Sequence, residues 1–113
     1  MDGTPLTQEI TELHAEICSA MADPRRILLL SAISQQPRNV SDLADFIGIS
    51  QPAASRHLKI LRDRGLVQSV RQGANVEYNL MDSRLIEALN LLRDVLRDRL
   101  TYRASLIEEV SNI

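Results

Sequence analysis

Residues 50–75 bring together side chains that could bind a charged partner. The segment holds five cations and one anion, a net charge of +4, whereas the whole chain carries −2 and the remainder therefore −6. The cations are Arg56, Lys59, Arg62, Arg64 and Arg71. Their guanidinium and ammonium groups donate hydrogen bonds to phosphate oxygens. A basic segment in an acidic chain predicts a surface for a polyanion, although the cluster alone is equally typical of a solvated helix face.

The spacing of side chains in residues 51–64 separates an apolar side from a polar side if this segment is helical. Successive residues of a helix turn by about 100°. One side then holds Ala54, Leu58 and Leu61. The opposite side holds Pro52, Ser55, Arg56 and Lys59. We therefore expect residues 51–64 to bury the first side and to offer the second to DNA.

Each residue type on the polar side suits a particular contact in the major groove. Arg56 could donate two hydrogen bonds to one guanine. We expect Gln51 and Ser55 to hydrogen-bond bases or phosphates, and Lys59 and Arg62 to neutralise phosphates. The positive N-terminal end of this helix would favour a phosphate as well.

Turn and capping residues place this segment in a helix-turn-helix. Ser41 is an N-cap candidate for a short helix over 42–47, and Gly48 follows its last turn. Ser50 is an N-cap candidate for the next helix, which Gly65 closes. A short helix that braces a longer basic helix is the arrangement that delivers a recognition helix to the major groove.

Two short strands, 66–71 and 75–80, are expected after the basic helix because apolar residues partly alternate there. Polar and glycine residues between them predict a hairpin tip. The hairpin, residues 66–80, would form a wing whose tip contacts an adjacent groove or the DNA backbone. Its expected contact residues are Arg71, Gln72, Gly73 and Asn75. A plain hairpin with a polar turn is the alternative.

Amphipathic helices are expected at both ends of the chain, over about 7–21 and about 83–110. Between the first of them and the helix-turn-helix, Asp23 and Pro24 begin a further helix that stops before Pro37. The end helices carry more apolar surface than one small domain needs, so we expect a homodimer that buries both stripes. The expected interface residues are Ile10, Leu13, Ile17, Leu89, Leu92 and Leu96. The alternative is an end helix that packs on its own domain.

Together these elements predict one mainly α domain over residues 1–113 with a small β-hairpin. The order is four helices, two strands and a helix (α-α-α-α-β-β-α), a winged helix-turn-helix that dimerises through its first and last helices. A symmetric dimer would present two recognition helices to half-sites about one DNA turn apart. We therefore expect double-stranded DNA with an inverted-repeat operator as the partner.

Three stretches resemble the ArsR/SmtB family of transcriptional regulators over about residues 15–81. Residues 21–27 (MADPRRI) resemble the family's "ALADPTRL" opening, and residues 50–61 (SQPAASRHLKIL) its "SQxxxSxHLxxL" recognition helix. The wing motif is matched by Gly65-Leu66-Val67, Arg71, Gly73 and Tyr78-Asn79-Leu80. The resemblance implies a homodimeric repressor that leaves DNA when an inducer binds. It also places His57 at the family's recognition-helix histidine, among the DNA contacts or as a support of the helix.

Ligands for the metal sites of this family are missing from the sequence. The short helix over 42–47 has no cysteine and the last helix has no histidine, so we expect no metal and no cofactor. His14 and Cys18 share one helix face and could assemble a metal or redox site across a dimer. Both also flank an apolar stripe, and cysteine commonly behaves as a small buried apolar residue.

Composition narrows the function classes further. The chain has 113 residues, 44% of them hydrophobic and 25% charged, and only three aromatic residues, which disfavours stacking on single-stranded nucleic acid. One cysteine excludes an internal disulfide, and no signal peptide or membrane span is visible, so we expect a cytoplasmic protein. We expect no enzyme, because no nucleophile–base pair or phosphate-binding glycine loop is present. A winged helix that binds proteins in place of DNA is the remaining alternative.

Overall fold

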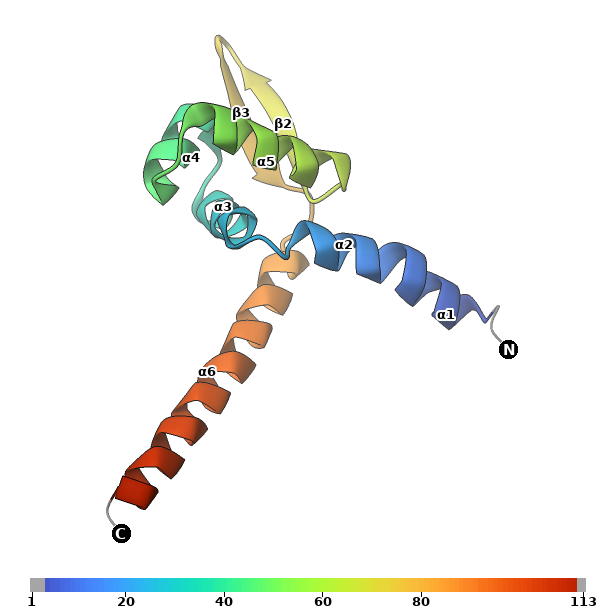
Figure 1. The fold of residues 1–113 in the computed structure, drawn as a ribbon. Coiled ribbons are helices and arrows are strands. Elements are labelled where there is room, and N and C mark those ends of the chain that lie inside the picture. The colour runs from blue at the N-terminus through green and yellow to red at the C-terminus, as the bar shows by residue number, and fades with distance from the viewer. Residues whose placement is uncertain (1–3, 112–113) are drawn as a thin grey trace. The chain divides into compact units, whose positions relative to one another are not determined.

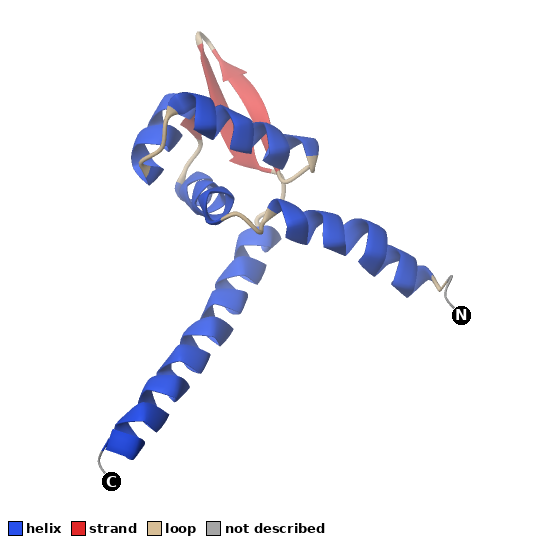
Figure 2. Ribbon diagram, in the orientation of Figure 1, coloured by secondary structure: helices blue, strands red, loops and turns tan. Residues whose placement is uncertain are grey.

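The computed structural model describes residues 4–111, which divide after Asp82 into two units (Figure 1). The first unit carries five α-helices, a π-helical segment and a three-stranded sheet among its described residues, and the second is helical (Figure 2). This confirms the mainly α winged architecture expected from the sequence, with one strand more than expected.

The first unit begins with an N-terminal helical segment that changes type along its length. It comprises α1 (Pro5–Glu9), the π-helical η1 (Ile10–His14) and α2 (Ala15–Ala20). The hydroxyl of Thr4 caps the start by accepting from the Thr7 N–H. At the end of η1 the Ala15 N–H donates to the Ile10 carbonyl, five residues back. The sequence predicted one regular helix over 7–21, and the π segment was not expected.

Helix α3 (Pro24–Gln35) begins where the sequence predicted. Asp23 caps it by accepting from the Arg25 N–H at 2.9 Å. The same carboxylate pairs with the Arg25 guanidinium at 3.0 Å. These bonds favour the charged carboxylate, and they lower the pKa of Asp23 to about 2.

A strand missed by the sequence analysis changes the start of the next helix. Strand β1 (Arg38–Asn39) pairs antiparallel with the hairpin, and α4 (Val40–Ile47) follows directly. The N-cap is therefore Asn39, whose side chain accepts from the Asp42 N–H at 2.8 Å, and the expectation of Ser41 was wrong. The helix ends at Gly48 with φ +76°, a left-handed conformation that favours glycine.

Helix α5 (Gln51–Asp63) has the N-cap that the sequence predicted, because Ser50 accepts from the Ala53 N–H at 3.2 Å. Strands β2 (Val67–Gln72) and β3 (Asn75–Leu80) follow. They pair antiparallel from Val67 with Leu80 to Gln72 with Asn75, and β3 lies in the middle of the sheet. The hairpin tip is therefore the two-residue turn Gly73-Ala74, one residue shorter than expected.

The core of the first unit lies where α3, α4, α5 and β2 meet. It is aliphatic, as the scarcity of aromatic residues suggests. Its large, fully buried side chains are Leu29, Leu30, Leu43, Leu58, Leu61 and Val67. Burial of each contributes about 1.5–3 kcal/mol, so this core holds α5 firmly against the two preceding helices.

The second unit contains α6 (Arg84–Ser111), a helix of 28 residues. The Ser83 carbonyl accepts from the N–H groups of Ile86 and Glu87, which places the helix start at the predicted position. None of the helices described over residues 4–111 is apolar enough over a sufficient length to cross a lipid bilayer.

Candidate nucleic-acid interface

The candidate interface is built on α4, the turn Gly48-Ile49-Ser50 and α5. After α4 ends, the N–H groups of Gly48 and Ile49 both donate to the Ala44 carbonyl, at 2.9 and 3.0 Å. This left-handed turn redirects the chain within three residues. The two helices thus form a helix-turn-helix whose second member is the basic one.

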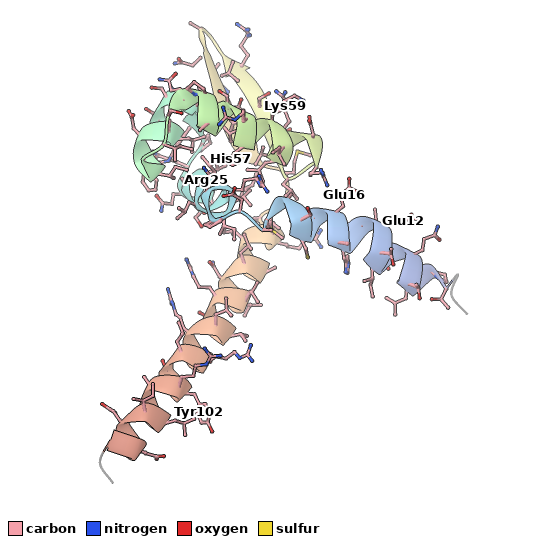
Figure 3. All side chains as sticks on the ribbon, in the orientation of Figure 1. Glu12, Glu16, Arg25, His57, Lys59 and Tyr102 are labelled. Atoms are coloured by element: carbon pink, nitrogen blue, oxygen red, sulfur yellow. The ribbon has the colours of Figure 1, made fainter. Side chains whose placement is uncertain are left out.

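One side of α5 is buried and the other is exposed, as its spacing predicts. Ala54, Leu58 and Leu61 are fully buried. The exposed residues include Gln51, Pro52, Ser55, Arg56, Lys59 and Arg62. Figure 3 shows Lys59 on the outer side of α5, away from α3. The geometry brings these six predicted contact residues onto one exposed surface, which we call the α5 surface.

Two residues of the α5 surface have partners within the chain. Lys59 Nζ lies 2.9 Å from Asp63 Oδ2, one helical turn away. Hydrogen bonding from Lys59 lowers the pKa of the Asp63 carboxyl. At the start of the helix the Gln51 amide donates to the Ser41 hydroxyl at 3.2 Å, which links α5 to α4. Both side chains keep further hydrogen-bonding capacity for DNA, because each of these contacts uses only one of their donors.

His57 does not belong to the α5 surface. Its side chain is 8% exposed and faces α3, where its Nδ1 lies 3.3 Å from Arg26 Nη1 (Figure 3). Desolvation lowers the pKa of His57, and the positive charges of Arg25, Arg26 and Arg56 act in the same direction, whereas Asp23 opposes them. The expectation of a direct DNA contact is therefore corrected, because His57 lies about 100° around the helix from Arg56 and supports the helix from its buried side.

Two arginines, Arg26 and Arg64, hold the N-terminal segment near α5, a role that the sequence did not predict. Arg26 donates from Nε to the Ala20 carbonyl and from Nη2 to the Ser19 carbonyl at 3.4 Å. Arg64 Nη1 lies 3.2 Å from Glu16 Oε1. Arg26 lies in a stretch compared with the family motifs and Arg64 lies just outside one, but only tertiary packing reveals their partners.

The hairpin presents its predicted contact residues at an exposed tip. Arg71, Gln72, Gly73 and Asn75 are all exposed. Gly73 adopts φ +63°, which lets a turn of two residues close the strands. The tip therefore offers one guanidinium and two amide side chains to a partner beside the α5 surface.

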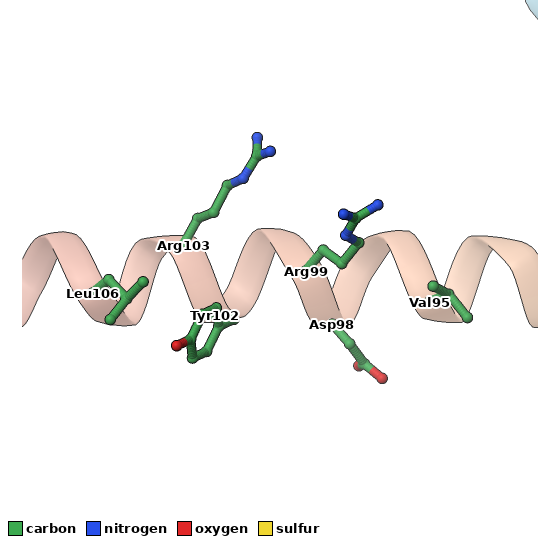
Figure 4. Close-up of a pocket in the computed structure, with 6 residues that line it drawn as sticks. All are labelled: Val95, Asp98, Arg99, Tyr102, Arg103 and Leu106. Carbon is green, nitrogen blue, oxygen red and sulfur yellow. The ribbon is translucent and has the colours of Figure 1, made fainter.

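Exposed apolar side chains mark the two helical segments expected to pair with a second copy. On the N-terminal segment Ile10 and Leu13 are 48% and 56% exposed, and Ile17 is half-buried. On α6 Leu92 and Leu96 are 56% and 49% exposed, and Leu89 is half-buried. Further along α6, Val95, Tyr102 and Leu106 line a shallow surface with Arg99 and Arg103 (Figure 4).

The candidate sensing residues His14 and Cys18 are both exposed in the single chain. Cys18 therefore does not pack as a buried apolar residue here. Over the described residues, no three or more His, Cys, Asp or Glu side chains gather closely enough to hold a metal ion.

The fold and this surface define a winged helix-turn-helix protein, and comparison with known proteins agrees. The structure is similar to the solution structure of the homodimeric winged helix-turn-helix DNA-binding domain Mb0332 from Mycobacterium bovis, with a TM-score of 0.78, 25% identity, and coverage of 90% of this chain and 95% of that one. It also resembles the crystal structure of NolR from Sinorhizobium fredii, with a TM-score of 0.73, 33% identity, and coverage of 81% and 92%.

Sequence comparison identifies the family. The model of the bacterial regulatory proteins of the arsR family matches residues 23–69. The regulator NmtR of Mycobacterium tuberculosis is 35% identical over 78% of this chain and 73% of its own length. A transcriptional repressor SmtB homolog of Synechocystis sp. is 44% identical over 72% of this chain, and the match spans 59% of that relative. The chain belongs to the ArsR family.

Proposed function

We propose that this DNA-binding transcriptional regulator is a homodimeric repressor that binds an inverted-repeat operator through the α5 surface and the hairpin tip. The observation that carries the proposal is the α5 surface itself, a polar and basic helix side backed by fully buried Ala54, Leu58 and Leu61. A helix held this firmly can enter the major groove without losing its place in the core.

The chemistry of each side chain indicates whether it contacts bases or phosphates. Arg56 is exposed near the middle of α5 and reads a guanine edge, for which a planar guanidinium is suited. Lys59, Arg62 and Arg71 contact phosphates and supply affinity that does not depend on sequence. Gln51 and Ser55 lie in the first turns of α5, where a helix entering the groove comes closest to the bases.

We propose a dimer because apolar side chains are exposed along two helical segments of the single chain. The N-terminal segment and α6 both expose leucine side chains that a symmetric copy would cover. The similarity to a homodimeric DNA-binding domain supports the same assembly. Two copies present two α5 helices, which matches half-sites roughly 34–36 Å apart.

Repression and its release are further parts of the proposal. Several relatives are named as repressors, among them the Synechocystis protein and a protein of Streptomyces lividans named "Probable mercury resistance operon repressor". We propose that an inducer releases the protein from its operator.

The experiment that tests this function is selection of bound duplexes from a random-sequence DNA pool. The proposal predicts enrichment of an inverted repeat with half-sites about one helical turn apart, bound by two chains. Transcription from a promoter that overlaps the repeat should fall when the protein is added. Failure to enrich any sequence over repeated rounds would contradict the proposal and favour a winged helix that binds protein.

A further inference from the structure

Arg26 joins the end of one helix to the buried side of another. It lies in the first turn of α3 and is half-buried. Its Nε and Nη2 donate to the carbonyls of Ala20 and Ser19, at the end of α2. Its Nη1 lies 3.3 Å from Nδ1 of His57, in the middle of α5. One guanidinium thus spans α2, α3 and α5.

The contact with Arg26 determines the protonation state and the tautomer of His57. A guanidinium group can only donate hydrogen bonds, so Nδ1 of His57 must accept. The ring is therefore neutral and carries its proton on Nε2. The last carbonyls of α2 form the negative end of the helix, which suits a cation. Each group that contacts Arg26 thus complements its donors.

A second contact joins the same two helices. Arg64 follows α5 directly and donates from Nη1 to the Glu16 carbonyl at 3.3 Å, while the same nitrogen lies 3.2 Å from Glu16 Oε1. With both contacts, α2 is fastened to the middle and to the end of α5. The sequence neighbour of His57 is Arg56, about 100° around the helix, so a rotation or shift of α5 that follows the His57 ring would also move Arg56.

We propose that Arg26 is a positioning residue that couples α2 to α5 through His57, so that displacement of the N-terminal segment changes the affinity of the α5 surface for DNA. The proposal deepens the function proposed above and rests on it. The N-terminal segment exposes Ile10 and Leu13 to a partner copy, so a change in subunit pairing would reach α5 through this guanidinium. Arg26 itself makes no contact with DNA in this scheme.

Arg25 offers a matched control for the test. It carries the same charge and precedes Arg26, but its guanidinium pairs with Asp23 of its own helix cap. Arg26→Met and Arg25→Met therefore remove equal charge and keep similar side-chain length. We expect Arg26→Met to weaken binding to the selected duplex about ten-fold more than Arg25→Met does. Equal losses would overturn the proposal and assign both effects to charge.

Amide hydrogen exchange gives a readout that would not respond to DNA if Arg26 had only a structural role. The N–H groups of Met21 and Ala22 donate to carbonyls of α2 and report on its end. Because coupling is reciprocal, the selected duplex should slow their exchange in the wild type and in Arg25→Met, but not in Arg26→Met. Unchanged exchange at Met21 and Ala22 in the wild type would also overturn the proposal.

Three more variants keep the test decisive if Arg26→Met fails to fold. Arg26→Lys retains the charge but cannot make all three contacts at once, so a smaller loss in the same direction is expected. His57→Asn keeps an acceptor near the position of Nδ1 and should retain the duplex-dependent protection. His57→Leu removes that acceptor and should lose the protection, so full duplex-dependent protection in His57→Leu would contradict the route through His57.

Failure of this inference and failure of the proposed function give different results. If the wild type shows no preference for any duplex, the proposed function is wrong, and the effect of Arg26 on DNA affinity cannot be measured. The coupling is then judged in the free dimer by amide exchange along α5. Faster exchange in Arg26→Met than in Arg25→Met would support the contact between the helices, and equal rates would overturn it.

Discussion

Lys59 Nζ lies 2.9 Å from Asp63 Oδ2, so a cation placed to meet a phosphate already pairs with a carboxylate of its own helix. The pair is exposed on both sides, and an exposed pair of this kind contributes little to stability. DNA phosphate can therefore replace Asp63 at low cost. The carboxylate would still repel the DNA backbone, and it lowers the net charge of the surface that we propose binds DNA.

We predict that Asp63→Asn tightens binding to every duplex, because it frees Lys59 and removes a negative charge from α5. The gain should be larger at low salt, since phosphate contacts release counterions. Glu12→Gln is the charge-matched control, because Glu12 lies along the N-terminal segment, away from Lys59 (Figure 3). Fluorescence anisotropy over a salt series measures both. Equal gains in the two variants would show that net charge alone is responsible.

Arg56 and Lys59 should differ in how they affect binding. Arg56→Ala should cost about 1–3 kcal/mol of specific affinity and relax the preference at one base pair. Lys59→Ala should weaken all duplexes alike and reduce the salt slope by about one. Titration of each variant with the selected duplex and with a scrambled one separates these effects. Unchanged binding by both variants would remove α5 from the recognition role.

The buried position of His57 predicts a pH dependence of folding. Its pKa in the folded chain is below the ordinary 6.5, so the unfolded chain binds more protons between the two values. The free energy of unfolding should therefore fall as the pH drops through 6.5 and level off below the folded pKa. The charged groups near the ring are Asp23, Arg25, Arg26 and Arg56.

His57→Asn should flatten this part of the stability curve, because an amide does not titrate there. Urea unfolding between pH 8 and pH 5 measures the effect. The lowered pKa of Asp23 has a separate window, since its stabilisation is lost only as the pH falls from 3.8 towards about 2. A wild type and a His57→Asn variant with the same slope between pH 6.5 and pH 5 would contradict the burial of a neutral ring.

We predict that Leu92→Asp yields monomers, because it places a charge in the apolar stripe of α6 that the dimer would bury. Asn90→Asp introduces the same charge about 160° around the helix and should leave the dimer intact. Light scattering of both variants gives the oligomeric state. A persistent Leu92→Asp dimer would show that the subunits meet elsewhere.

The sequence predicted features that depend on a few adjacent residues. Asp23 and Ser50 cap their helices as expected, and Gly48 closes α4 in the left-handed conformation. Each feature depends on hydrogen bonds or backbone angles within one turn, so the residue type at that position is enough to predict it. The apolar spacing of Ala54, Leu58 and Leu61 likewise identified the buried side of α5.

The features that were missed depend on residues far apart in the chain. Strand β1 exists because Arg38 and Asn39 pair with Tyr78 and Glu77, and no local pattern marks it. Because of that pairing the N-cap of α4 is Asn39 and not the predicted Ser41, although both residue types make good caps. Arg26 and His57 are 31 positions apart, so a contact between them could not be inferred from spacing.

Recognition of DNA by a dimer can be measured by anisotropy of the wild-type protein with the selected duplex and with a scrambled duplex, over a salt series. We expect two chains per duplex, a salt-sensitive affinity and a preference of about 10³-fold or more for the selected sequence. Weak and equal binding to both duplexes at every salt concentration would contradict this expectation.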